Sequence, residues 1–451
     1  MNKGIEQRYN SKARKTYYNV SITMLFSLLA YVVYFYLNTL VARWLGPALY
    51  GDFSVAIYLI SLTGFVMLLG KNSSVVKYLP QYIHQKKWDF ARGCLKQDIK
   101  LVTSIGGGIF VFGVIIALLL FPYLHGNFTI FNSSFTPYYH PFLLTIWIIP
   151  LFAFNLYLSQ FILSLNRPVS STFTNPKGIA LQTVFSLFII LIYLINKNIT
   201  FYHMFYAYAV ALLFIIFFQL FILVIITPRN LINFKDTTKD KGWIKNSLYF
   251  LISSVVLILM GQISLLLLEA LGHKENDVGI LSAIFAATGI CWVVLTATSQ
   301  VFKPIIMPTL KSNDPSKNMQ KLYFRANILL CGQAFLLTLI LYVFRFKILG
   351  LFGDHFKHFG VQAYLIILPS IFVIIATGSA SYFLQFSGKV VALIKLSGSA
   401  LILQLILCLL LIPHYDLLGA AISFSLSEIV VCIGLVFVAR KKMGLKFCWL
   451  F

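Results

Sequence analysis

Long apolar runs, separated by short polar segments, dominate this sequence of 451 residues. A membrane-spanning helix needs about 20 mostly apolar residues, and runs of that length recur from one end of the chain to the other. Twelve spans are predicted, over residues 18–42, 52–70, 100–122, 141–165, 178–195, 201–226, 248–271, 278–302, 326–344, 361–384, 390–412 and 415–439. The pattern predicts an all-α polytopic membrane protein.

The composition agrees with this prediction. Apolar residues make up 59% of the chain and charged residues 11%, whereas soluble domains carry roughly 25% charged residues. A soluble enzyme, a disordered scaffold and a nucleic-acid-binding domain are therefore excluded. The first run is long, is preceded by Lys12, Arg14 and Lys15, and lacks a small-residue cleavage site, so we expect a spanning helix there and no cleavable signal peptide.

The distribution of the basic residues predicts the orientation of the chain in the membrane. With both termini in the cytoplasm, the cytoplasmic segments hold 30 of the 36 Lys and Arg residues and the opposite side holds six. Membrane proteins concentrate Lys and Arg on the cytoplasmic side. Topology therefore explains most of the net charge of +23, and no nucleic acid partner is expected.

Motifs for catalysis, metal binding or nucleotide binding are not apparent. None of the six cysteines falls in a predicted extracytoplasmic loop, and no C-x-x-C pair occurs, so neither a disulfide framework nor a zinc site is indicated. The longest predicted external loop, 123–140, is too short for a domain. We expect a protein that is not an enzyme and holds no cofactor. Its transport would be driven by an ion gradient (H⁺ or Na⁺) or by the membrane potential.

The two halves of the chain contain an ordered series of matching residues. Gly51 and Ser54 recur as Gly279 and Ser282, and a proline follows each glycine by 29 residues. This series predicts a duplication of six spans, with a site at the interface of the repeats. The expected organisation is a cytoplasmic tail, an N-terminal six-helix bundle, a cytoplasmic linker, a C-terminal six-helix bundle and a second tail, over 1–17, 18–226, 227–247, 248–439 and 440–451.

Polar residues form a stripe along the first span and a sparser one along the seventh. The first stripe, spaced by three and four residues as on one helix face, comprises Asn19, Thr23, Ser27, Tyr31, Tyr34 and Asn38. The second comprises Ser247, Ser254, Gln262 and Glu269. Such stripes face protein or water rather than lipid. They indicate either hydrogen bonds between helices or, as we favour, the wall of a hydrated central cavity.

Glu428 differs from the other ionisable residues within the spans because it lies near the middle of the twelfth. An acidic residue at that depth is a candidate proton or cation relay or a substrate contact. The alternative is a protonated side chain that is hydrogen-bonded between helices.

Two regions carry a resemblance to a known family. The run from Leu40 to Gly51, with Arg43, Gly46, Pro47 and Tyr50, is followed by an apolar span and then by residues 75–82. This region resembles the opening of the polysaccharide-exporter (O-antigen-type) flippases of the MOP superfamily, which also contains the MATE multidrug extruders. Residues 411–422 resemble the turn between the eleventh and twelfth spans of these proteins. The chain departs from the family at Asp416, where glycine is common.

The resemblance implies a V-shaped pair of six-helix bundles that alternates between inward-open and outward-open states in a bacterial cytoplasmic (inner) membrane. The implied substrate is a glycan on a polyprenyl diphosphate, moved to the outer leaflet for surface polysaccharide biosynthesis. Besides this lipid-linked glycan and the bilayer, the implied partners include a polysaccharide polymerase or glycosyltransferases.

A diphosphate needs cations, and sugars need hydroxyl or amide groups. For the diphosphate we expect contacts from Arg43, Lys71, Lys77, Lys303, Arg325 and Lys395. The alternative role for each of these cations is anchoring to lipid headgroups. The sugar-facing candidates are Tyr31, Tyr34, Asn38 and Gln262. Glu269 is the candidate gate residue, pairing with Arg43, and Glu428 the candidate for ion coupling.

Two other classes of function are weighed against this one. A MATE-like multidrug or small-cation efflux transporter would require an acidic cavity, whereas acids within the predicted spans are few. A membrane-bound glycan polymerase or ligase would require a large external loop with catalytic cations, and the short loops speak against it.

Overall fold

The computed structural model describes residues 3–124, 141–195, 197, 200–232, 242–310, 314–387 and 389–446. Every regular element among these residues is a helix, and none is a strand. The all-α prediction is confirmed. The predicted external loop 123–140 and the middle of the predicted linker 227–247 lie largely outside the described residues.

The chain packs into two compact units. Unit 1 comprises Met1–Gly51 and Val256–Phe451, and unit 2 comprises Asp52–Val255. The chain passes between them within α1 (Lys3–Met67) and again within α9 (Gly242–Leu271). The boundaries of these packing units differ from the ends of the two predicted six-span halves. The duplication of the halves stays a prediction.

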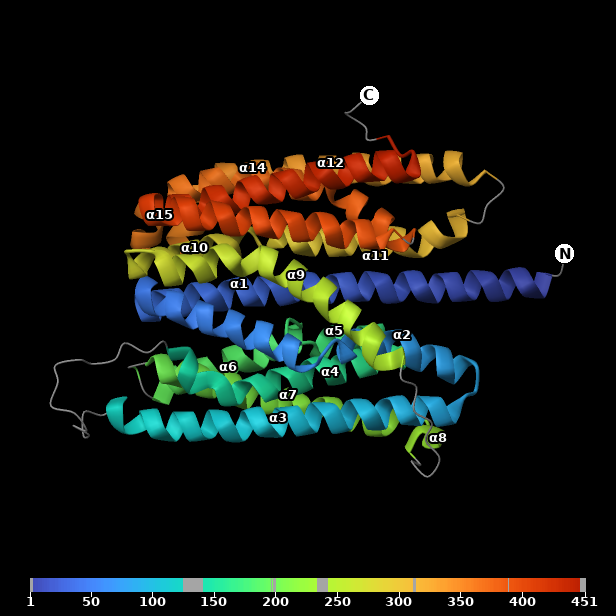
Figure 1. Cartoon of the computed structure of the whole chain (residues 1–451), viewed down its shortest axis with the longest axis horizontal. Helices are drawn as coiled ribbons and strands as arrows, with labels where there is room; N and C mark the ends of the chain where they lie inside the picture. The colour runs from blue at the N-terminus through green and yellow to red at the C-terminus, as the bar shows by residue number, and fades with distance from the viewer. Residues whose placement is uncertain are drawn as a thin grey trace. The chain divides into compact units, whose positions relative to one another are not determined.

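Unit 2 contains the second part of α1, the first part of α9 and the helices between them. These are α2 (Lys71–His84), α3 (Trp88–Leu124), η1 (Pro141–Ile148), α4 (Ile149–Ser164), α5 (Pro168–Thr174), α6 (Ile179–Ile195), α7 (Phe201–Ile226) and α8 (Arg229–Ile232). Helix α4 packs against α2, α3 and α7 (Figure 1). Apolar side chains such as Leu79, Ile162 and Leu212 are buried in its core.

Unit 1 is built around a central helix, α14 (Asp354–Phe386). The helices that pack on α14 are α10 (Glu275–Thr288), α11 (Ile290–Leu310), α12 (Pro315–Val343), α13 (Arg345–Phe352) and α15 (Val390–Met443). Figure 1 shows α12, α14 and α15 running side by side. The first part of α1 and the second part of α9 complete the unit.

Ten of the described helices or helix pairs are long and apolar enough to span a membrane. Two of them, α1 and α15, each contain two predicted spans joined at a kink, which reconciles the ten helices with the twelve predicted spans. Helix α7 exposes large side chains, including Phe217, Phe221 and Val224, and such a surface fits contact with lipid rather than water. The chain is a multi-pass membrane protein.

Each kink occurs where the backbone leaves the helical region. Gly46 has φ 76° and ψ 170° and is followed by Pro47. Glycine adopts positive φ without steric cost, and proline suits the first turn of the next helix. Asp416 has φ 43° and ψ −119°, so the position at which the resembling family often has glycine is one with a left-handed backbone.

The segment between the predicted second and third spans is mostly helical. Residues 71–100 are predicted to lie on the cytoplasmic side, and that placement stays a prediction. Helix α2 and the first turns of α3 occupy most of this segment, and Lys71 is buried. The apolar positions of α2 follow helical spacing and pack on α3 and α4, so this amphipathic segment is part of the unit's core.

Candidate functional site

Two opposite charges lie in the interior of unit 2. The Nζ atom of Lys71 lies 2.9 Å from Oδ1 of Asp98, and the two side chains are 1% and 0% exposed. Buried charges in proteins are paired, because an isolated one is too costly to desolvate. Asp98 lies within Trp88–Ile116, a segment long and apolar enough to span a membrane, and ionisable groups in such segments are functional candidates. This pair is therefore the starting point of the site.

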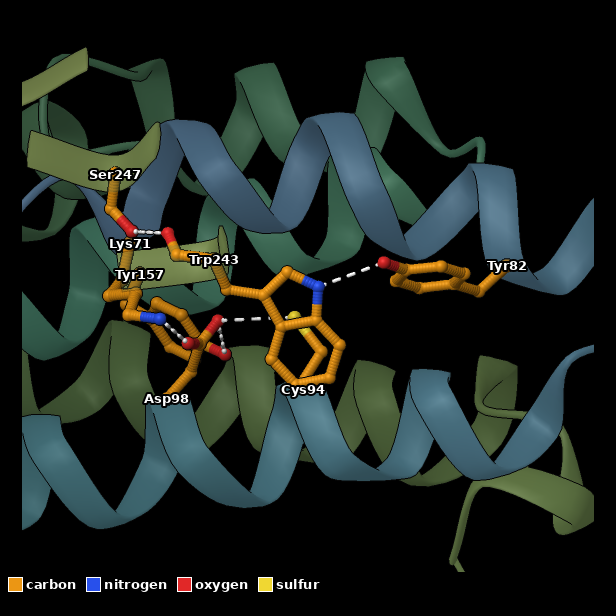
Figure 2. Close-up of polar contacts among 7 residues, drawn as sticks. All are labelled: Lys71, Tyr82, Cys94, Asp98, Tyr157, Trp243 and Ser247. Carbon is orange, nitrogen blue, oxygen red and sulfur yellow. Dashed lines mark hydrogen bonds and ion pairs between the residues drawn. The ribbon is translucent and has the colours of Figure 1, made fainter. Parts of the chain in front are cut away.

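Two further polar side chains converge on the same carboxylate. The Tyr157 hydroxyl donates to Oδ2 of Asp98 at 3.5 Å, and the Cys94 thiol lies 3.9 Å from that atom. Figure 2 shows the four side chains gathered between α2, α3 and α4. We call Lys71, Asp98, Cys94 and Tyr157 the Lys71 cluster. Its carboxylate accepts from three sides, as an ionised carboxylate can.

Local backbone geometry places these groups. Cys94 and Asp98 are one helical turn apart on α3 and so share a face. Lys71 begins α2 directly after two left-handed residues, Leu69 with φ 46° and Gly70 with φ 76°. The amide of Lys71 donates to the carbonyl of Leu68 at 2.8 Å. A leucine at positive φ is strained, so the chain reverses sharply just before the cluster.

The first part of α9 closes over this turn. A Cβ atom at Gly70 would lie 2.0 Å from the carbonyl oxygen of Ser247, so only glycine allows the approach. The indole N–H of Trp243 donates to the Tyr82 hydroxyl at 2.8 Å. Figure 2 shows Trp243 and Ser247 beside the Lys71 cluster. Helix α9 therefore contacts α2 at the start and near the end of α2.

Asp98 and Trp243 are not among the residues predicted from the sequence. Asp98 lies two residues before the predicted third span, and α3 begins at Trp88. A usable signal was present, since Ala91, Cys94, Asp98 and Val102 recur at helical spacing and are all buried. An acid within that apolar stripe indicates a buried partner.

Among the sugar-facing candidates, Tyr31 and Asn38 make hydrogen bonds within unit 1. The Tyr31 hydroxyl lies 3.0 and 2.9 Å from the carbonyls of Ala286 and Ala287, beside the break between α10 and α11. Asn38 donates to the carbonyl of Tyr34 at 2.7 Å and accepts from Tyr50 at 2.9 Å. Their contact with sugar stays a prediction.

The remaining sugar, gate and coupling candidates are also in unit 1. Gln262, Tyr34 and Glu269 are partly exposed, whereas Glu428 is 5% exposed. The thiols of Cys291 and Cys432 lie within electrostatic reach of the Glu428 carboxyl. Glu428 is thus buried as the sequence pattern suggested, and its role stays a prediction.

The cation candidates other than Lys71 are more accessible. Arg43 donates to the carbonyls of Leu351 and Gly350, at 2.6 and 3.4 Å, near the end of α13. The ammonium of Lys77 lies 5.4 Å from the centroid of the Phe250 ring. Arg325 on α12 and Lys395 on α15 are exposed. The side chain of Lys303, on α11, lies outside the described residues.

Comparison with known proteins gives a consistent result for the fold. No family model matches the sequence. No curated protein matches it. Among solved structures, an inward-facing multidrug resistance MATE family transporter of the MOP superfamily aligns with a TM-score of 0.72 at 13% identity, over 94% of this chain and 98% of that one. The chain has the MATE fold.

Two other structures with this fold align at similar coverage. The outward-facing conformation of a MATE family transporter has a TM-score of 0.63 at 15% identity, over 95% of this chain and 96% of that one. A MOP superfamily transporter from Pyrococcus furiosus, described as having a binding pocket of reverse polarity, has a TM-score of 0.64 at 14% identity over the same fractions. At these identities the MATE fold is shared, and the substrate is a separate question.

Proposed function

We propose that this protein is a membrane transporter that works by alternating access. The single observation that carries the proposal is the MATE fold, which aligns over 94% of the chain with a transporter structure. The ten apolar helices support it. Polar side chains within the spans support it as well, because a chain that only anchored itself in lipid would not need them.

We further propose that the cargo is a glycan on a polyprenyl diphosphate, moved from the cytoplasmic to the outer leaflet. A diphosphate with sugars cannot cross hydrocarbon unaided, because each unsolvated charge is costly there. The run from Leu40 to Gly51 supports this cargo through its resemblance to the polysaccharide exporters. In that run, Gly46 forms the helix kink and the Tyr50 hydroxyl donates a hydrogen bond to Asn38. The resemblance therefore supports common ancestry with the exporters more than it supports contact between these residues and the substrate.

The accessible cations are the proposed diphosphate contacts. Arg43 binds two carbonyls, yet a guanidinium has five N–H donors and can serve a phosphate as well. Lys71 could reach a diphosphate only after separating from Asp98. The polar stripe of α1 and Gln262 would face the sugars.

A second candidate is efflux of drugs or small cations. The solved transporters with this fold that are described as multidrug resistance proteins favour it. Cation efflux calls for carboxylates that face the cargo, whereas Asp98 is paired with Lys71. The two candidates therefore differ in the charge of the solute that the protein should move.

Deletion of the gene from its host separates the candidates. We expect lipid-linked glycan to accumulate in the inner leaflet, while sensitivity to cationic drugs stays unchanged. Complementation with Arg43→Gln should fail although the protein is made, whereas Arg229→Gln, a matched change at another exposed arginine, should restore export. Normal surface glycan in the deletion strain, with no redundant flippase, would reject the glycan cargo. Increased sensitivity of the deletion strain to cationic drugs, with normal surface glycan, would favour efflux.

A further inference from the structure

The Lys71 cluster has a feature that a simple structural ion pair does not need. Three polar atoms on residues within three positions of Lys71 or Asp98 in the sequence are buried without a hydrogen-bond partner among the described residues, namely Oδ1 of Asn72 and Oγ of Ser74 on α2 and Oε1 of Gln97 on α3. Asn72 and Ser74 are 4% and 0% exposed. Buried polar groups of this kind typically bind ordered water, and water is a route for protons.

We propose that Asp98 is a proton-binding site, and that its protonation releases Lys71 and loosens the first part of α9 from the turn at Gly70. Calling this proton the coupling ion rests on the proposed transport function. The binding step itself, a proton added to a carboxylate oxygen of Asp98, does not.

Protonation of Asp98 would change the charge balance of the Lys71 cluster. With Asp98 ionised, the Lys71 cluster is neutral and Lys71 can stay buried at 2.9 Å from the carboxylate. Once Asp98 takes up a proton, the ammonium of Lys71 has lost its counter-charge in the interior. An uncompensated buried charge is strongly destabilising, so Lys71 must move toward water or lose its own proton.

Among the side chains that the structure describes, no cation other than Lys71 faces Asp98. Lys71 faces it from α2, Tyr157 from α4 and Cys94 from α3 itself. The other helices packed on α3 are η1, which has no titratable residue, and α8, whose Arg229 is exposed. On α9, Trp243 and Ser247 are uncharged, and the side chain of Lys245 lies outside the described part of the chain. Protonation of this one carboxylate therefore changes the net charge of the whole cluster.

Movement of Lys71 would act directly on α9. Lys71 follows the left-handed residues Leu69 and Gly70, and the Gly70 turn touches the backbone at Ser247 and Leu251. Lys71 is thus directly attached to a strained turn that touches α9, and displacement of its unpaired ammonium toward water would move that turn. Because α9 continues from unit 2 into unit 1 at Val256, a change at this turn affects the helix that the two units share.

Hydrogen exchange on the full-length protein in nanodiscs tests this inference at constant pH. Asp98→Asn mimics the protonated carboxyl, and we expect amides in residues 66–76 and 242–255 to exchange at least about tenfold faster than in the wild type, as expected for a local opening. The double variant Lys71→Met with Asp98→Asn removes both charges and should exchange like the wild type. Amides of α7 serve as the internal reference and should not change in either variant.

Two results would overturn the inference. One is that the amides of Asp98→Asn exchange as slowly as those of the wild type. The other is that the amides of the double variant exchange as fast as those of Asp98→Asn, because the unpaired charge of Lys71 would then not be the cause of the opening. If Asp98→Asn does not fold, the wild type is titrated between about pH 8 and pH 5, the range in which perturbed carboxyl groups titrate. Exchange in 242–255 relative to α7 must then rise as the pH falls, and a constant ratio rejects the inference.

Transport measurements separate this inference from the proposed function. If the protein moves its cargo but the double variant still responds to an imposed proton gradient, Asp98 is not the coupling site. If the exchange result holds but no cargo moves, the proton switch stands and the transport proposal fails.

Discussion

Gly51 and Gly279, the first matched residues of the two sequence halves, meet backbone to backbone in unit 1. A Cβ atom at Gly51 would lie 2.8 Å from the amide nitrogen of Gly279, and one at Gly279 would lie 1.8 Å from the carbonyl oxygen of Pro47. The turn of α1 just after the kink at Gly46 and the start of α10 therefore approach closely at two glycines. The duplication of the two halves stays a prediction.

Gly279→Ala should destabilise the protein, because the clash is with backbone that cannot rotate away. Overpacking of this kind typically costs about 1–3 kcal/mol. Gly332→Ala on α12 is the matched control, since nothing lies within 4 Å of its Cβ position. The apparent melting temperature of the purified protein in detergent should fall for Gly279→Ala only. Equal melting temperatures for the two variants would contradict the close approach.

The turn between the predicted eleventh and twelfth spans depends on Asp416. Its carboxylate accepts from the backbone amide of His273 at 3.0 Å and lies 2.9 Å from Nδ1 of that side chain. Asp416→Ala loses these bonds and keeps a β-carbon at φ 43°, so we expect a loss of about 1–2 kcal/mol. Asp416→Gly loses the same bonds but removes the backbone strain. In thermal unfolding it should be the milder change, and the reverse order would disprove the strain.

The hydrogen bond between Trp243 and Tyr82 can be measured by a double-mutant cycle. Trp243→Phe and Tyr82→Phe each remove one partner and retain much of the ring packing. The two changes should couple by about 0.5–1.5 kcal/mol, the typical net value of a hydrogen bond. Additive effects on thermal stability would mean that the bond contributes nothing to holding α9 on α2.

Tyr31 is the residue at which structural and sugar-binding roles are easiest to separate. Tyr31→Phe removes a hydroxyl that lies 3.0 and 2.9 Å from two carbonyls at the end of α10, and we expect a loss of about 1 kcal/mol of stability. Tyr36→Phe, at a side chain that is 62% exposed, is the control. If Tyr31→Phe lowers transport with unchanged stability, the hydroxyl contacts cargo rather than the helix break.

Hydropathy was sufficient to predict the all-α class and the apolar spans, because both depend on local composition, whereas the kinks at Gly46 and Asp416 come from the structure. The Lys71 cluster could not be predicted that way. Lys71 and Asp98 are 27 residues apart, and a window of apolar residues does not show that two opposite charges neutralise each other. Helix α2 was not predicted either, because it is too short to span a membrane and lies between two predicted spans. The distribution of the cations in residues 71–100 matched the positive-inside pattern, which concealed one buried lysine among exposed ones.

The sequence pattern predicted which side chains form the polar stripe of α1, but not which groups those side chains contact. Tyr31 and Asn38 form hydrogen bonds with other residues of unit 1. Helix periodicity places residues on a face and does not state what that face meets. The contact of Arg43 with the end of α13 could not be predicted from periodicity either, because its partner carbonyls are more than 300 residues away in the sequence.

Reconstitution into proteoliposomes shows whether the protein moves a lipid-linked glycan between leaflets. The liposomes carry a fluorescent polyprenyl-diphosphate oligosaccharide, and its transfer between leaflets is followed with a membrane-impermeant glycan-cleaving enzyme. We expect the purified protein to make the protected half of this lipid accessible and to move no cationic dye under the same conditions. Liposomes in which the glycan lipid stays protected, or in which the dye moves instead, would contradict this expectation.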